Sequence, residues 1–179
     1  MNRKLLIGYL ALVSLVLVFG SKVARKLDQL MSQSVVVLGD QDVDPAFLGV
    51  GWVAEQNAQG QRFSEVDLSK VELISPIEEG EDVIPGEEWM QRLKESNRLD
   101  ARLLKILWEK QELIPREWKG RTQEGYIRCI FFTGTVFANP LGERCVFYLS
   151  WYGGEWHLNH RWLGGRFNTA ELACVVKND

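Results

Sequence analysis

The chain has 179 residues, of which 46% are hydrophobic, 25% are charged and 11% are aromatic, and its formal net charge is −3. This composition excludes a wholly disordered chain, a collagen and a small disulfide-dense scaffold. Because proteins that bind duplex nucleic acid usually present a basic surface, the slightly acidic balance also argues against a nucleic-acid partner.

The N-terminal segment is the most apolar part of the sequence. Arg3 and Lys4 precede an uncharged run over residues 5–20, which as a helix would be about 24 Å long at about 1.5 Å per residue. A membrane hydrocarbon core is about 30 Å thick, and flanking basic side chains can extend toward the headgroups. We therefore expect residues 1–26 to be a membrane anchor that contacts lipid through residues 5–20. A cleaved signal peptide and a buried helix of a soluble domain are the alternatives.

The cysteines bear on the compartment. Cys129, Cys145 and Cys174 are odd in number and scattered through apolar surroundings, unlike a disulfide framework. This pattern favours a reducing compartment. The expected localisation is therefore a single-pass membrane protein; the basic charges, three on each side of the segment, leave its orientation open, and the cysteines favour the cytoplasmic side for the C-terminal part.

Residues 27–84 form a second region, which is acidic and in which glycine and proline are frequent. Such a composition is typical of loops and short strands rather than long helices. Short strands are expected at residues 35–38 and 66–74, and the second of them should end before Pro76.

Residues 85–179 form the third region and begin with two expected helices. Pro85 and the acidic residues after it favour a helix start, because proline is tolerated in the first turn and acids are favourable at the positive end of the helix dipole. A second helix is expected to run to about Gln111, with Leu99 and Leu103 in its apolar stripe, and to end before Pro115. Together they predict a helical hairpin packed on a sheet.

The sheet should follow these helices. Three runs rich in β-branched and aromatic residues, Tyr126–Ala138, Arg144–Tyr152 and Glu155–Leu163, are separated by turn residues at 139–142 and 153–154. They predict an antiparallel β-meander followed by one more short element. The expected fold class is therefore α+β: a helical hairpin packed on an antiparallel β-meander, preceded by one N-terminal transmembrane helix.

Several motifs in this part of the chain resemble those of a group of short, uncharacterised bacterial proteins. The shared pattern is IPxxWK, FFxGTV, YLxWxxGxW and WL, which this sequence carries in Ile114–Lys119, Phe131–Val136, Tyr148–Trp156 and Trp162-Leu163. The resemblance covers residues 66–177 and implies a shared fold. It implies no activity and no functional residues.

The meander also carries the best candidate for a binding surface. Residues alternate along 155–162, so one face should be apolar and packed on the core while the other is polar. The candidate ligand-binding residues of the polar face and its aromatic border are Glu155, His157, Asn159, Arg161, Trp151 and Tyr152. Aromatic rings beside hydrogen-bonding groups suit a sugar or a peptide. The simpler interpretation is that this face is only solvated.

No pattern in the sequence indicates catalytic residues, a metal site or a cofactor. His157 and His160 are three residues apart on an expected strand, so they point to opposite faces and cannot jointly bind one ion. Ser150 could lie across a strand pair from His157, but no strained nucleophile turn surrounds it. Gly49 and Gly51 lack the third glycine of a phosphate-binding loop.

The sequence therefore favours a membrane-anchored, non-catalytic binding or interaction module with an unidentified protein or glycan ligand. Two alternatives stay open. One is a hydrolase-type enzyme whose site lies where the acidic loops meet the meander. The other is an exported glycan-binding module.

Overall fold

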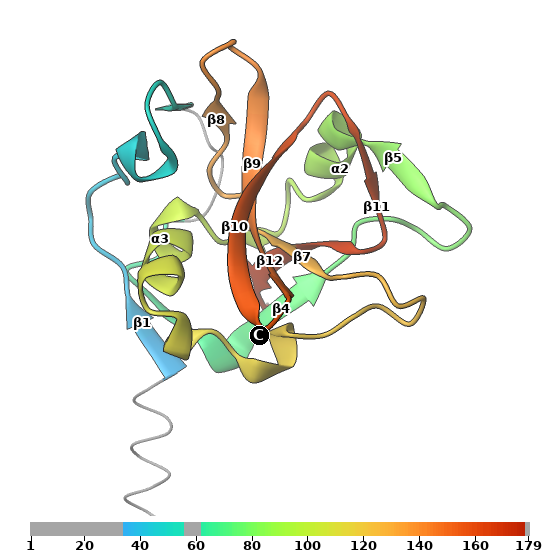
Figure 1. The fold of residues 1–179 in the computed structure, drawn as a ribbon, viewed down its shortest axis with the longest axis horizontal. Helices are drawn as coiled ribbons and strands as arrows, with labels where there is room; N and C mark the ends of the chain where they lie inside the picture. The colour runs from blue at the N-terminus through green and yellow to red at the C-terminus, as the bar shows by residue number, and fades with distance from the viewer. Residues whose placement is uncertain (1–33, 56–61, 178–179) are drawn as a thin grey trace, which may run out of the picture. The chain divides into compact units, whose positions relative to one another are not determined.

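β-Strands make up most of the regular secondary structure in the computed structural model, which describes residues 34–55 and 62–177 (Figure 1). Within these residues there are two α-helices, α2 (Gly86–Arg92) and α3 (Ala101–Glu109), and both are short. The expected α+β class is therefore wrong for the described part of the chain, because sheet predominates in it.

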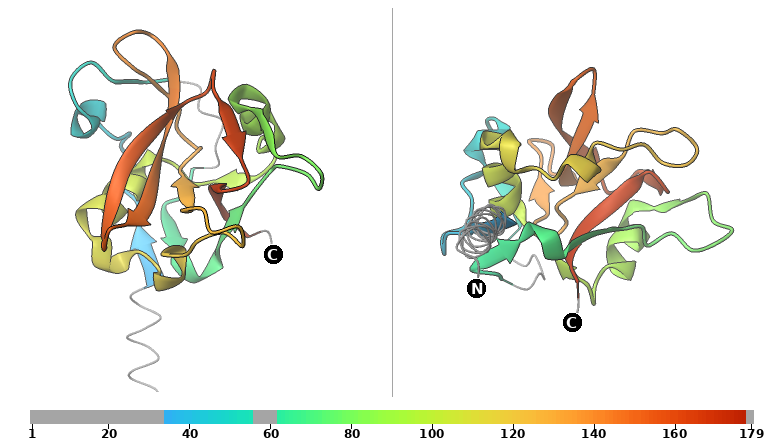
Figure 2. Two further views of the ribbon diagram at one scale, coloured as in Figure 1. Left: turned by 45° about the vertical axis from the view of Figure 1, so that its right-hand side comes forward. Right: turned by 90° about the horizontal axis from the view of Figure 1, so that it is seen from below.

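The largest sheet has eight strands and curls into a half-barrel (Figures 1 and 2). Its order is β2-β8-β9-β7-β12-β4, with β10 paired to β9 and β6 paired to β12. The strands are β2 (Val53–Ala54), β4 (Val71–Ile74), β6 (Asn97–Arg98), β7 (Cys129–Phe131), β8 (Phe137–Ala138), β9 (Arg144–Tyr152), β10 (Glu155–Trp162) and β12 (Glu171–Val176).

β9 and β10 form the long hairpin of this sheet. Their register runs from Tyr152 opposite Glu155 to Cys145 opposite Trp162. Gly153 and Gly154 make the turn with φ values of +64° and +91°. Positive φ at both central residues is the geometry whose twist suits a two-residue hairpin, and glycine adopts it without strain. This part of the expected meander is confirmed.

The rest of the expected meander is different. The run Tyr126–Ala138 is divided into β7 and β8, which pair in succession with the edge of β9 that β10 leaves free. The last element, β12, pairs with β7 in parallel. The three expected runs are therefore antiparallel neighbours, as predicted, but they belong to a larger mixed sheet.

Two small two-stranded sheets and four 3-10 turns complete the described structure. β1 (Val35–Val37) pairs with β3 (Glu65–Asp67), and β5 (Val83–Pro85) pairs with β11 (Arg166–Asn168). The short strand expected at 35–38 is thus confirmed as β1, whereas the single strand expected at 66–74 is divided into β3 and β4, which belong to different sheets. The 3-10 turns are η1 (Pro45–Leu48), η2 (Leu68–Lys70), η3 (Gln111–Leu113) and η4 (Arg116–Trp118).

The two helices pack on opposite faces of the main sheet. Ile130, Leu149 and Cys174 point toward α3, in a cluster that we call the α3 cluster. Their neighbours along the same strands point the other way, into the α2 cluster, which contains Phe131 and Ala173. Both faces of the central strands are therefore buried, as the alternation of side chains in a strand requires.

The expected helical hairpin is consequently wrong. Between the helices, β6 pairs with the end of β12, and the N–H of Leu99 donates to the carbonyl of Cys174 at 3.0 Å. The chain thus passes through the level of the sheet after α2 and begins α3 on the other side. The Asp100 side chain caps α3 by accepting from the N–H of Arg102 at 3.0 Å.

The expectation of a single-pass membrane protein is also corrected. Among the residues that the structure describes, no helix is both long and apolar enough to cross a bilayer. The segment predicted to be the transmembrane helix and to contact lipid, residues 5–20 within 1–26, lies outside the described residues.

Candidate functional site

The register of the β9–β10 hairpin decides which candidate residues share a face. Asn159 lies opposite Tyr148 and Glu155 opposite Tyr152, so their side chains project to the same side of the sheet. We call this surface the polar face; its members are Glu155, His157, Asn159, Arg161, Tyr148 and Tyr152. Five of the six predicted residues are thus brought together. The sixth, Trp151, lies on the opposite side.

Trp151 belongs to the α3 side of the hairpin. It lies opposite Trp156 in the register, and the two rings are 5.4 Å apart at an interplanar angle of 67°. The ammonium of Lys119 is 3.7 Å from the centre of the Trp151 ring. Trp151 therefore supports the core strand rather than the border of the polar face.

At the turn end of the polar face, Tyr152 and His157 form a stacked pair. Their ring centres are 3.6 Å apart and nearly parallel, with an interplanar angle of 10°. The His157 Nε2 atom is 3.3 Å from the Tyr152 carbonyl and 3.6 Å from a carboxylate oxygen of Glu155. This end therefore presents a flat aromatic plate beside one exposed carboxylate.

At the other end of the polar face, the partly exposed Arg161 forms an ion pair with the buried Glu171. Its Nε atom lies 3.2 Å from the carboxylate of Glu171, and its Nη2 atom donates to the carbonyl of Arg166 at 2.6 Å. The Glu171 side chain is buried and also accepts from the backbone N–H of Asn168. Burial raises the pKa of Glu171, while the hydrogen bond from Asn168 and the charge of Arg161 oppose that rise.

The thiol nearest to this ion pair is poorly suited to nucleophilic chemistry. Burial, together with the negative charge of Glu171, raises the pKa of Cys129 to about 11. Burial also raises the pKa of Tyr148, which lies on the same face. Because the thiolate is the nucleophile, a thiol with so high a pKa is almost entirely protonated at neutral pH.

The opposite face of β10 is core toward the turn, as the alternation predicts, but His160 farther along the strand is exposed. Trp156 is buried, and Leu158 packs at the border of the same α3 cluster. The His160 ring contacts Trp52 at 4.9 Å between ring centres. Trp162, at the end of the strand, departs from the expectation because half of its surface is exposed.

The outer edge of β10 is the feature that the sequence did not reveal. In a two-residue hairpin the residues flanking the turn form a hydrogen-bonded pair, so Glu155 and every second residue after it bond to β9. The bond from the N–H of Leu163 to the carbonyl of Arg144, at 2.8 Å, fits this phase. The backbone groups of Trp156, Leu158 and His160 therefore point away from β9.

These outward backbone groups lack partners in the structure. β10 pairs with β9 and with no other strand among the described residues. The carbonyl of Trp162 accepts from the N–H of Gly165 at 3.1 Å, but no described residue hydrogen-bonds to the backbone of Trp156, Leu158 or His160 on the outer side. β10 is thus an open edge of eight residues, about 26 Å long.

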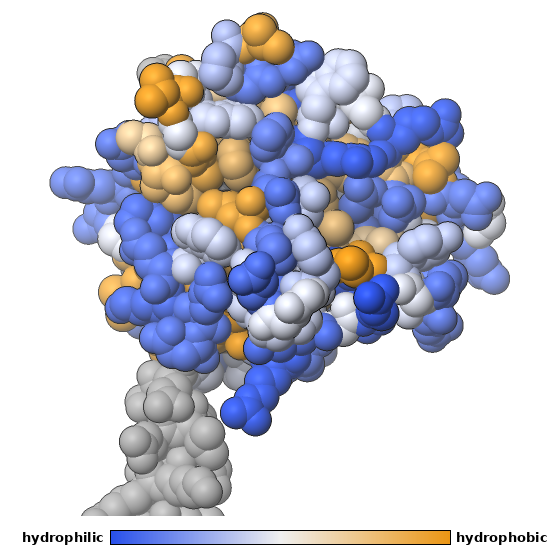
Figure 3. Space-filling view, viewed as in Figure 1, coloured by the Kyte–Doolittle hydropathy of each residue, from blue (hydrophilic) through white to orange (hydrophobic). Residues whose placement is uncertain are grey.

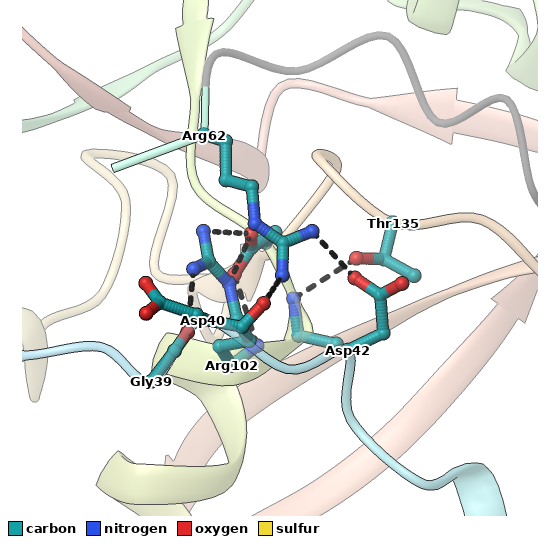
Figure 4. Close-up of polar contacts among 8 residues, drawn as sticks. Gly39, Asp40, Asp42, Arg62, Arg102 and Thr135 are labelled. Carbon is teal, nitrogen blue, oxygen red and sulfur yellow. Dashed lines mark hydrogen bonds and ion pairs between the residues drawn. The ribbon is translucent and has the colours of Figure 1, made fainter. Parts of the chain in front are cut away.

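A cavity of about 330 Å³ lies at the start of α3 and is lined by residues of both charges. Arg62 pairs with Asp42 at 2.7 Å, and it also donates to the carbonyl of Asp40. Arg102 donates from Nε to the Asp100 carboxylate and from Nη1 to the Gly39 carbonyl, each at 2.8 Å (Figure 4). Both guanidinium groups are thus held by the chain itself. We interpret this cluster as a clamp that holds the 39–42 segment against α3.

Exposed apolar side chains gather elsewhere, over the η1–β2 segment and the turn between β8 and β9 (Figure 3). Val50 is 98% exposed, Leu141 83% and Val53 62%. These residues belong to a short edge strand and two turns, which offer little regular backbone for docking. We therefore regard the open edge of β10 and its polar face as the candidate site.

Sequence reasoning missed Glu171 as well as the open edge. Glu171 begins an otherwise apolar strand, and an acid at the start of such a run is a signal for a buried charge with a partner. Its partner, Arg161, was among the predicted residues.

A scan against family models, a search of curated proteins and a search of solved structures gave no match to this chain.

Proposed function

We propose that this chain is a non-catalytic interaction module that binds an extended polypeptide segment by adding it as a strand to the outer edge of β10. The observation that carries the proposal is the unpaired backbone of Trp156, Leu158 and His160. Folded proteins usually shield such edges with proline, bulges, inward charges or covering elements. β10 contains no proline, and its eight residues pair with β9 in unbroken register.

The side chains beside the edge support the same proposal. In strand addition the backbone supplies affinity, and the side chains on the two faces supply selectivity. The polar face offers Glu155, Asn159 and Arg161, and the stacked Tyr152–His157 pair offers an aromatic surface. The high pKa of Cys129 makes thiol-based hydrolysis at this site unfavourable.

A proline placed on the outer edge tests the proposal. The N–H of His160 points outward, so His160→Pro removes no hydrogen bond to β9, and its ring blocks an added strand. His160→Ala is the matched control, because it also loses the contact with Trp52 but keeps the N–H. Both variants should have the far-UV circular dichroism spectrum of the parent.

The probe is a displayed library of random extended peptides, selected on the full chain. Selected peptides should bind the parent and His160→Ala with similar affinity and lose at least about tenfold, or about 1.4 kcal/mol, on His160→Pro. Peptides that bind His160→Pro and His160→Ala equally well would exclude strand addition at β10. A selection that yields no binding peptide would contradict the proposal as well.

A further inference from the structure

We infer that the segment added to β10 is β10 of a second copy of this chain, paired antiparallel about a two-fold axis at Leu158. This inference rests on the proposed function and names its partner. In that arrangement the numbers of two residues that face each other add up to 316. Leu158 then faces Leu158 of the second copy, and Trp156 faces His160.

The outward backbone groups of β10 fit this register. Trp156, Leu158 and His160 have their N–H and carbonyl groups on the outer edge, and in the two-fold arrangement these three positions pair among themselves. Antiparallel residues of this kind exchange two hydrogen bonds per pair, so the interface would contain about six backbone hydrogen bonds. If the register were shifted by one residue, the outward N–H and carbonyl groups of one copy would face residues of the other copy whose backbone groups already bond to β9.

In the same register, opposite charges of the two copies lie across from each other. Glu155 would face Arg161 of the second copy, and by symmetry Arg161 would face Glu155. These positions are the pairs without backbone bonds, where side chains of opposite strands approach most closely. The Glu155 side chain is 73% exposed and Arg161 is 44% exposed, and in the dimer Glu155 of the second copy would join Glu171 and the Arg166 carbonyl as partners of Arg161.

The exposed tryptophan at the end of β10 also finds a counterpart. Trp162 is 50% exposed, although the strand alternation would place it on the core face. In the two-fold register it faces Gly154 of the second copy. Nothing lies within 4 Å of the place where a Cβ of Gly154 would be, so there is open space for an aromatic ring. Gly154 belongs to the turn and has no side chain, so its backbone is open to the Trp162 ring of the second copy.

The test is the self-association of the full chain, measured by sedimentation equilibrium over a range of concentrations. Glu155→Arg would place two arginines opposite each other twice per dimer and should weaken association about tenfold or more. Arg161→Glu should do the same with two carboxylates. An equimolar mixture of these two variants restores opposite charges at both positions, so it should associate about as well as the parent.

Arg161→Glu loses the ion pair with Glu171, so it can fail to fold. His160→Pro then serves as the second test. This variant should abolish the dimer, whereas His160→Ala should retain it. A dimer that survives His160→Pro, or a charge-swapped mixture that associates no better than its components, would overturn the inference. A parent that stays monomeric would also overturn it. Peptides from the library that still require the open edge would then leave the proposed function standing.

Discussion

The two faces of the main sheet are covered to different extents. On the α3 side, Leu103 and Leu107 pack in a cluster that also contains Val36, near the start of the described chain, and Trp156 of β10. On the α2 side, Trp89 packs with Phe131 and the β5–β11 sheet at one end only. The rest of that side, along β9 and β10, is the polar face.

The α3 side is covered more fully because its cluster also contains residues of β1, β3, η2 and η4, whereas α3 itself is only two residues longer than α2. The seven residues of α2 span about 10 Å, whereas the eight residues of β10 span about 26 Å. A helix this short cannot cover the whole strand, so the strand carries polar residues on the part of this face that α2 does not reach. One hairpin is therefore core on one side and a polar surface on the other.

The largest expected effect tests whether the smaller α2 cluster is as necessary as the α3 cluster. Trp89 is fully buried, and its ring is 4.9 Å from that of Phe167. Trp89→Ala should lower the free energy of unfolding by about 3–5 kcal/mol, and Leu103→Ala on the α3 side by about 2–5 kcal/mol. Both should unfold in a single urea transition. Two separate transitions in Trp89→Ala would show that the faces of the sheet are independent.

A second prediction sharpens the comparison at the start of α2. A Cβ on Gly86 would lie 2.5 Å from the Leu163 carbonyl oxygen and 2.6 Å from the Phe167 ring. Gly86→Ala should therefore cost about 1–3 kcal/mol in thermal or urea unfolding, because the backbone of Leu163 cannot easily move away. Gly39→Ala is the matched control, since nothing lies within 4 Å of its Cβ position. Equal stability of the two variants would refute the close packing of α2.

These close contacts mark the limit of what the sequence could predict. Local signals located both helices and the β9–β10 turn, because capping residues, proline and Gly153-Gly154 act on their immediate neighbours. The placement of the helices depends on β6 pairing with β12, a contact between residues 97–98 and 175–176. No local pattern specifies such a distant pair, so the two helices were expected to form a hairpin.

The candidate site shows the same division. Alternation alone placed Glu155, His157, Asn159 and Arg161 on one face. The sequence prediction also placed both Trp151 and Tyr152 at the border of that face, but consecutive strand residues point to opposite sides, and the structure places these two so. The open edge could not be predicted, because it depends on which strands lie beside β10 in space.

A smaller effect concerns the pH dependence of two acids on the α2 side. Burial raises the pKa of Glu171, so the folded chain holds that proton more tightly than the unfolded chain does. The stability contributed by Glu171 is then full below its ordinary pKa of 4.5 and falls as the pH rises through the raised value. Glu171→Gln should gain stability relative to the parent over that range.

Glu81 provides the contrast, because its pairing with Arg92 lowers its pKa to about 2. Its contribution should be full above pH 4.5 and should be lost as the pH falls toward 2. Glu81→Gln should therefore lose stability near neutral pH and approach the parent in acid. Urea titrations of the parent and of both variants at several pH values give, for each variant, the slope against pH of its difference in unfolding free energy from the parent. Slopes of the same sign would contradict the different environments of the two carboxylates.

The smallest expected effect is on the α3 side of the hairpin, where Lys119 lies over the Trp151 ring at 3.7 Å. A cation above an exposed aromatic ring contributes about 0.5–1 kcal/mol, so Lys119→Met should lower the free energy of unfolding by that amount while keeping an apolar stem. Lys177→Met is the control, because Lys177 pairs with Glu72 at the surface and contacts no ring. A larger loss in Lys119→Met would mean that Trp151 depends on this lysine for its position. Because Trp151 and Trp156 pack the turn end of β10 on the core, the proposed self-association should then weaken in the same variant. If stability falls only slightly and self-association is unchanged, the α3 side acts as a scaffold and binding is confined to the edge and the polar face.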